Sequence, residues 1–212
     1  PVASVARFDD LPTRYRAVST DLESGESVVL EGGDLATAMR ASSSAPGVFA
    51  PIELDGRLLV DGGLADNLPV EVARSMGVDV LIVVDVGFPL RSRGSLDSAT
   101  SISSQMLSIM VRRGSDAQRR KLLPEDVLLT PALGEDDSTF DLAITARAIG
   151  LGETAARDAA PRLAPLALDE RGYAEFLARR AARRQPLPRI DTVRVAGDSV
   201  RYSRLLNAEL PN

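Results

Sequence analysis

The chain has 212 residues, with 44% hydrophobic and 26% charged side chains, enough for one folded domain and the start of another. Its net charge of −5 offers no basic footprint, so no nucleic-acid partner is expected. It contains neither cysteine nor histidine, which excludes disulfides, thiolate sites and the commonest general base and zinc ligand. Hydrolytic chemistry would have to use carboxylates, hydroxyls and backbone groups, and no cofactor is expected.

Two hairpins are predicted in the first third of the chain. Residues 14–22 (RYRAVSTDL) and 27–30 (SVVL) have the composition of strands and are joined by a short polar turn. Residues 52–54 and 57–60 flank Asp55-Gly56, the strongest short hairpin signal in the sequence.

Caps and breakers predict two short helices in the same region. Asp34 is a suitable N-cap for a helix that runs to about Ser43. Pro69 opens a second helix, which extends to Met76 and stops at Gly77. The apolar face of the first helix is expected to comprise Leu35, Ala38 and Met39.

The remaining elements predict an α/β layered domain. Residues 78–86 (VDVLIVVDV) are β-branched and continuous, as expected for a strand buried on both faces of a parallel sheet. They are too few to span a bilayer. Residues 127–130 form a second short strand, and helices are predicted over 98–121, 140–163 and 169–184. Strands that alternate with helices favour this class of fold.

The long helix over 98–121 carries Ile102, Met106, Ile109 and Met110 at helical spacing. Packing in the core is the ordinary explanation for such a face. The alternative is a surface that covers the mouth of an active site or contacts lipid.

One pattern carries chemical information. Residues 41–51 read ASSSAPGVFAP, 58–63 read LLVDGG and 67–70 read NLPV. This combination resembles bacterial patatin-like phospholipases, in detail over residues 17–87 and less closely to about residue 184. The D-G-G sequence alone is common in turns, but the combined pattern is specific.

The resemblance implies a three-layer α/β sandwich, of which residues 1–185 form the C-terminal portion. It also implies a dyad made of a serine in a G-x-S-x-G elbow and the aspartate of D-G-G, here Asp61. The expected activity is hydrolysis of carboxylic esters in phospholipids or at a membrane surface. Asn67 and Pro69 match family positions and are expected to shape the turn into the next helix.

The chemistry of Asp61 agrees with this assignment. It follows an apolar strand and precedes Gly62 and Gly63, which permit positive φ angles and close approach of another backbone. A partly shielded carboxylate there can accept a proton from a serine hydroxyl during acyl transfer, so no histidine is needed. The alternative is an ordinary turn residue.

Other polar residues are better explained by structure. Ser42, Ser43 and Ser44 lack a glycine-flanked elbow and are expected to cap the end of a helix. The aspartates at positions 55, 61, 66 and 85 lack the spacing of a calcium loop, so no metal site is expected.

The family's nucleophile motif and glycine-rich oxyanion loop do not occur in the 212 residues. We therefore expect an N-terminal part of the same catalytic domain to supply them and to stay bound to this chain. The chain alone is expected to be inactive, and self-association into a homo-oligomer stays open.

The last residues differ in character. A basic run over 179–184 precedes Pro186 and Pro188, which predicts a domain boundary. Residues 188–197 (PRIDTVRVAG) resemble the first strand of a POTRA domain, so residues 189–212 are expected to begin a small α+β domain. This resemblance implies a patatin-like autotransporter, secreted or associated with the outer membrane; a cytoplasmic protein is the alternative.

Two other functions compete with the lipid hydrolase. A non-catalytic module could keep the patatin scaffold for binding lipid or protein. A nucleotide-binding doubly wound domain is suggested by residues 78–87, but no G-x-G-x-x-G or P-loop follows a predicted strand.

Overall fold

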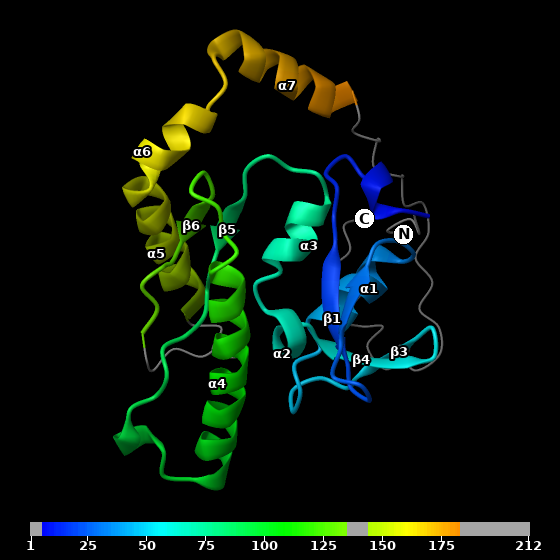
Figure 1. Cartoon of the computed structure of the whole chain (residues 1–212), viewed down its shortest axis with the longest axis vertical. Helices are drawn as coiled ribbons and strands as arrows, with labels where there is room; N and C mark the ends of the chain where they lie inside the picture. The colour runs from blue at the N-terminus through cyan, green and yellow to red at the C-terminus, as the bar shows by residue number, and fades with distance from the viewer. Residues whose placement is uncertain (1–5, 135–143, 183–212) are drawn as a thin grey trace, which may run out of the picture. The chain divides into compact units, whose positions relative to one another are not determined.

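The structure is a computed structural model that describes residues 6–134 and 144–182 (Figure 1). The chain separates after Gly172 into two units, residues 1–172 and 173–212. The described residues form a mixed α/β fold, as predicted. Both sheets and all predicted site residues belong to the first unit.

A four-stranded antiparallel sheet forms from the two predicted hairpins. Its strands are β1 (Ala17–Asp21), β2 (Ser27–Leu30), β3 (Ile52–Leu54) and β4 (Arg57–Asp61), in the order β2-β1-β4-β3. Strand β1 is shorter than predicted, because its ladder with β2 begins at the pair Ala17–Leu30. In the second hairpin Asp55 and Gly56 have φ angles of 51° and 74°, the positive values that a type I′ turn requires.

Helix α1 (Leu35–Ser42) packs on β1 and β4. Its predicted cap is confirmed, because the Asp34 carboxylate accepts a hydrogen bond from the backbone N–H of Thr37 at 2.7 Å. The Thr37 side chain, and after it this backbone bond, lower the pKa of Asp34. Ala38 is buried in a cluster with Phe8 of the short helix η1 (Phe8–Asp10), and Leu35 packs against that cluster. Met39 is exposed, so only Leu35 and Ala38 of the predicted apolar face pack in the core.

The second sheet is parallel, as predicted, and pairs β5 (Ile82–Val84) with β6 (Val127–Leu129). Burial on both faces is wrong for the described residues. Leu81 is buried, but Ile82, Val84 and Val86 are 55%, 51% and 58% exposed. The reason is that β5 hydrogen-bonds to β6 alone in this part of the chain, and no described layer covers the other side chains.

Three helices follow β4. The short helix α2 (Gly63–Asp66) leads into α3 (Val70–Ser75), which ends where Gly77 adopts a φ angle of 72°. Helix α4 (Ala99–Arg119) begins at a capping box in which the side chains of Ser98 and Ser101 each accept a hydrogen bond from the other's backbone N–H. Its C-terminal half contacts α2 and α3. Its three most exposed apolar residues are Ile102, Met106 and Met110, so the core-packing interpretation is wrong for them.

The predicted helix over 140–163 is interrupted. Helix α5 (Ile144–Asp158) is followed by α6 (Ala160–Leu163), because Pro161 lies in the first turn of a new helix and lacks a backbone N–H. The short helix η3 (Ala164–Leu166) leads to α7 (Glu170–Ala182), which confirms the last predicted helix over its described residues. Another short helix, η2 (Arg93–Ser95), precedes α4. The POTRA-like segment 189–212 lies outside the described residues.

No helix in the described ranges combines the length and the apolar character that crossing a membrane would require.

Candidate active site

Asp61 is the last residue of β4, and its backbone is fixed from two sides. Its N–H donates to the carbonyl of Ser44 at 3.0 Å, and its own carbonyl accepts from the Thr20 hydroxyl at 2.9 Å. The next N–H, from Gly62, donates to the carbonyl of Ser42 at 3.4 Å. The turn that carries the carboxylate is therefore held between β1 and the C-terminal end of α1.

The carboxylate of Asp61 has one fixed and one open oxygen. Oδ1 accepts a hydrogen bond from the backbone N–H of Gly63 at 2.8 Å. Among the described residues Oδ2 has no hydrogen-bond donor, and the side chain is partly buried at the wall of a cleft. An oriented carboxylate with one oxygen open to the cleft can accept a proton there.

The two glycines serve close packing. Neither has a positive φ angle, so the predicted conformational role is wrong. A Cβ on Gly62 would lie 2.2 Å from the carbonyl oxygen of Val18 on β1. A Cβ on Gly63 would lie 2.9 Å from Asn67 Oδ1 and 3.1 Å from Asp61 Oδ1. Glycine at both positions lets the turn lie directly against β1 and leaves space for the Asp61 carboxylate and Asn67.

Asn67 and Pro69 connect the turn to the helices. Asn67 follows α2 and donates from Nδ2 to the Ser115 hydroxyl on α4 at 3.2 Å. Pro69 is the residue before α3 and has a φ angle of −75°, which its ring favours. Both residues occupy structural positions beside Asp61.

An open cleft of about 270 Å³ lies in front of this turn. All five predicted site residues line it: Asp61, Gly62, Gly63, Asn67 and Pro69. Another boundary of the cleft comes from β1 and the segment before it, including Tyr15 and Arg16.

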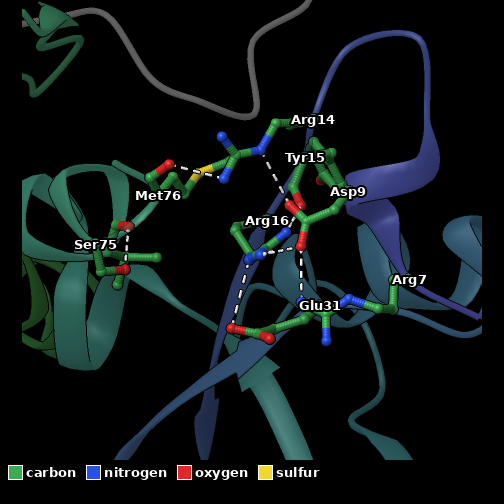
Figure 2. A network of polar contacts seen from close by, with 9 residues as sticks. Arg7, Asp9, Arg14, Tyr15, Arg16, Glu31, Ser75 and Met76 are labelled. Carbon is green, nitrogen blue, oxygen red and sulfur yellow. Dashed lines mark hydrogen bonds and ion pairs between the residues drawn. The ribbon is translucent and has the colours of Figure 1, made fainter. Parts of the chain in front are cut away.

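A network of charged residues supports this boundary (Figure 2). Asp9 accepts hydrogen bonds from Arg16, Arg7 and Arg14, at 2.8, 2.8 and 3.1 Å. These bonds, with Arg16 contributing most, hold the pKa of Asp9 far below its usual range. Arg14 also donates to the carbonyl of Met76 after α3 at 2.7 Å, so the network joins η1, the start of β1 and the end of α3.

Asp66 also lines the cleft. The sequence suggested no role for it other than metal binding, which was not expected. Its Oδ1 is buried and has no hydrogen-bond partner in the described part of the chain. Burial raises the pKa of Asp66, although Gln118 and Lys121 oppose this effect. Its position five residues after Asp61 was visible in the sequence, but its burial depends on α4.

The other polar candidates have structural roles. The hydroxyls of Ser42, Ser43 and Ser44 donate to the carbonyls of Val18, Met39 and Arg40, at 2.6, 2.9 and 2.6 Å. Asp55 lies in the hairpin turn, and Asp85 accepts from Arg119 Nε at 2.7 Å. Over the described ranges no three acidic side chains meet in a metal-binding arrangement.

Comparison with known proteins agrees with the geometry. Residues 5–74, which include the whole Asp61 turn, match the family model described as patatin-like phospholipase. An uncharacterized NTE family protein of Mycobacterium bovis is 40% identical over 108 residues, covering 51% of this chain and 30% of that protein. Patatin-like phospholipase domain-containing protein 7 of Mus musculus is 43% identical over 83 residues, and protein 6 of Homo sapiens is 40% identical over 83 residues.

Each of these two mammalian matches covers 38% of this chain and 6% of the relative. The chain thus spans less than a third of the length of any of these three relatives. Residues 5–74, which carry the Asp61 turn and line part of the cleft, are therefore similar to the patatin-like phospholipase family.

Proposed function

We propose that this chain carries the carboxylate half of a serine–aspartate site that hydrolyses carboxylic esters in lipids. The observation that carries the proposal is Asp61 itself. One oxygen is held by the Gly63 N–H at 2.8 Å, the other is open, and both belong to a cleft of about 270 Å³. Patatin-like phospholipase names among its relatives support a lipid ester as the substrate class.

In the proposed reaction a serine hydroxyl attacks the ester carbonyl while Asp61 Oδ2 accepts its proton. The tetrahedral intermediate collapses to an acyl-enzyme when that proton passes to the departing alkoxide, which leaves as an alcohol. A water molecule then attacks the acyl-enzyme and gives a proton to Asp61. Asp61 passes this proton to the departing serine oxygen as the fatty acid is released, which restores the serine hydroxyl and the carboxylate. The Gly63 N–H keeps Oδ1 in place, so the carboxylate need not reorient at each step.

The serine and the oxyanion donors belong, in this proposal, to an N-terminal part of the same catalytic domain. The 212 residues contain no G-x-S-x-G elbow and no glycine-rich loop. The exposed side chains of Ile82, Val84 and Val86 support such a partner, because a parallel strand is normally covered on both faces. An additional strand beside β5 and a helix over these side chains would bury them.

The direct test is a hydrolysis assay with a soluble p-nitrophenyl ester. The chain alone is expected to show no turnover, and the chain combined with the N-terminal part is expected to be active. In the combined protein Asp61→Asn should lower kcat by about 10³-fold or more, as the loss of an essential base does. Asp55→Asn is the matched control, because it removes the same charge from a turn outside the cleft.

Two results would contradict the proposal in different ways. Hydrolysis by the isolated chain that Asp61→Asn abolishes would show that the nucleophile lies within these residues. No hydrolysis by the combined protein would favour the alternative function, a non-catalytic scaffold that binds lipid or protein.

Secretion or outer-membrane association is a separate proposal. It depends on the POTRA resemblance of residues 189–212, which lie outside the described residues. Cell fractionation with an antibody to residues 6–134 would test it, and recovery only in the cytosol would contradict it.

A further inference from the structure

The two halves of helix α4 have different surroundings. The C-terminal half is bound to the rest of the unit: Ser115 accepts from Asn67 at 3.2 Å, and Arg119 donates to Asp85 at 2.7 Å. The N-terminal half makes its side-chain hydrogen bonds to other segments only with the loop before the helix, within the described residues. Gln105 accepts from the Arg91 N–H at 3.1 Å and donates to the Arg91 carbonyl at 3.2 Å. The Gln105–Arg91 bonds join the loop before α4 to the helix, and this loop together with the helix as far as Arg113 is named segment 87–113.

Segment 87–113 has an apolar stripe, formed by Ile102, Met106 and Met110, that no other described residue covers. Ile102, Met106 and Met110 are 49%, 62% and 60% exposed and follow one another at intervals of four residues. Four-residue spacing places them on one side of the helix. The residues that α4 does bury are polar ones, Ser101, Ser115 and Gln118. The stripe is therefore not the face by which α4 packs on its own unit.

Segment 87–113 has a positive net charge, whereas the whole chain has a negative one. Residues 87–113 contain four arginines and one acidic residue, Asp97, a net charge of +3 in a chain of net charge −5. The arginines are Arg91, Arg93, Arg112 and Arg113, and within the described ranges none of them forms an ion pair. Arg113 follows Ile102 by three turns, so it lies at the end of the stripe on the same side.

We infer that segment 87–113 is a docking surface for anionic lipid. Its stripe would lie among the upper acyl chains while the arginines contact lipid phosphates, as amphipathic helices do when they lie in a membrane interface. Charge decides between the occupants. A protein layer would have to supply a carboxylate for each of the four unpaired guanidinium groups, whereas an anionic bilayer supplies phosphates to all of them. The inference deepens the proposed function, because a docked helix would bring the Asp61 cleft, joined to α4 through Asn67, to its substrate.

Apolar insertion and electrostatic attraction each contribute to vesicle binding, and separate variants remove each contribution. Ile102→Ser/Met106→Ser/Met110→Ser should lower partitioning onto anionic vesicles by at least about tenfold, because three apolar side chains lose their insertion energy. Arg112→Gln/Arg113→Gln should lower it by about 30-fold at low salt, since each basic residue near an anionic surface contributes about fivefold. The loss in the arginine variant should shrink as salt is raised, and the loss in the stripe variant should persist.

The experiment measures co-sedimentation of the 212-residue chain with phosphatidylcholine vesicles, with and without phosphatidylglycerol. Circular dichroism checks that each variant is folded. Ile149→Ser/Leu168→Ser is the matched control, because those side chains are 68% and 56% exposed elsewhere in the first unit. Wild-type and control binding to the anionic vesicles, with loss in both test variants, supports the inference. Absence of wild-type binding, or equal binding by wild type and both test variants, overturns it.

The outcome is independent of the proposed hydrolase activity. Vesicle binding is measured on a chain that is expected to be inactive, whereas the p-nitrophenyl ester assay needs no vesicle. If the stripe variant instead fails to assemble with the N-terminal part of the domain while its vesicle binding is unchanged, the stripe is a protein interface and the inference is wrong.

Discussion

Gly62 lies against strand β1 with no space for a side chain. In Gly62→Ala the new methyl group would be 2.2 Å from the Val18 carbonyl oxygen and 2.6 Å from its carbonyl carbon. An ordinary contact needs more than 3 Å, and the obstacle is backbone, so β1 and β4 would have to separate by about 1 Å beside the pair Ser19–Asp61. Overpacking of this kind costs on the order of 3 kcal/mol.

Urea unfolding followed by circular dichroism measures this cost. Gly62→Ala should lower the unfolding midpoint with little change in the slope. Gly63→Ala should cost less, about 1 kcal/mol, because its nearest obstacle is the Asn67 side chain, which can rotate. Gly150→Ala is the control: nothing lies within 4 Å of the new methyl group in helix α5, so it should stabilise by about 0.5–1 kcal/mol. A Gly62→Ala midpoint equal to that of the wild type would refute the close approach of the turn to β1.

Two further predictions concern the elements that support the cleft. Asp34→Ala should lower the free energy of unfolding by about 1 kcal/mol in the same assay, because the Thr37 N–H at the start of α1 loses its acceptor; Asp34→Asn should recover most of this loss. Asp9→Asn should destabilise the protein at neutral pH, because Arg16, Arg7 and Arg14 lose their common carboxylate. The pKa of Asp9 is lowered from 3.8, so its stabilisation is complete above about pH 4 and is lost as the pH falls through the folded-state pKa. The difference in melting temperature between wild type and Asp9→Asn should accordingly narrow below pH 4, and a difference that widens there would contradict the assigned network.

Local chemistry explains which elements could be predicted. The Asp55-Gly56 turn, the Asp34 cap and the Gly77 stop each depend on a few neighbouring residues, and the structure has all three. The parallel sheet around residues 78–86 followed from their continuous β-branched composition, whereas the pairing of 82–84 with the predicted strand at 127–130 was not predicted. Asp61 and the four residues expected around it line one cleft because they are close in sequence as well as in space.

Features that depend on distant parts of the chain could not be predicted. The role of Gly62 is set by the register that brings Val18 beside it, and its φ angle of −65° gives no reason for glycine. Asp9 gathers three arginines only because η1 lies beside the start of β1. The exposure of Ile82 and Met106 also depends on which layers cover them, and periodicity alone does not reveal whether a layer is present.

The backbone bonds around Asp61 have a consequence for transplanting the site. The N–H groups of Asp61 and Gly62 are held by the carbonyls of Ser44 and Ser42, and the Ser42 hydroxyl in turn holds the Val18 carbonyl that faces Gly62. The serine-rich segment and the D-G-G turn are thus connected by hydrogen bonds, although 16 residues separate Ser44 from Asp61 in the chain. A D-G-G loop grafted alone onto another scaffold would keep the Gly63 bond to the carboxylate but lose the backbone bonds that fix the turn itself. A graft that includes residues 42–44 and the strand bearing Val18 would also transfer the hydrogen bonds that orient the Asp61 turn.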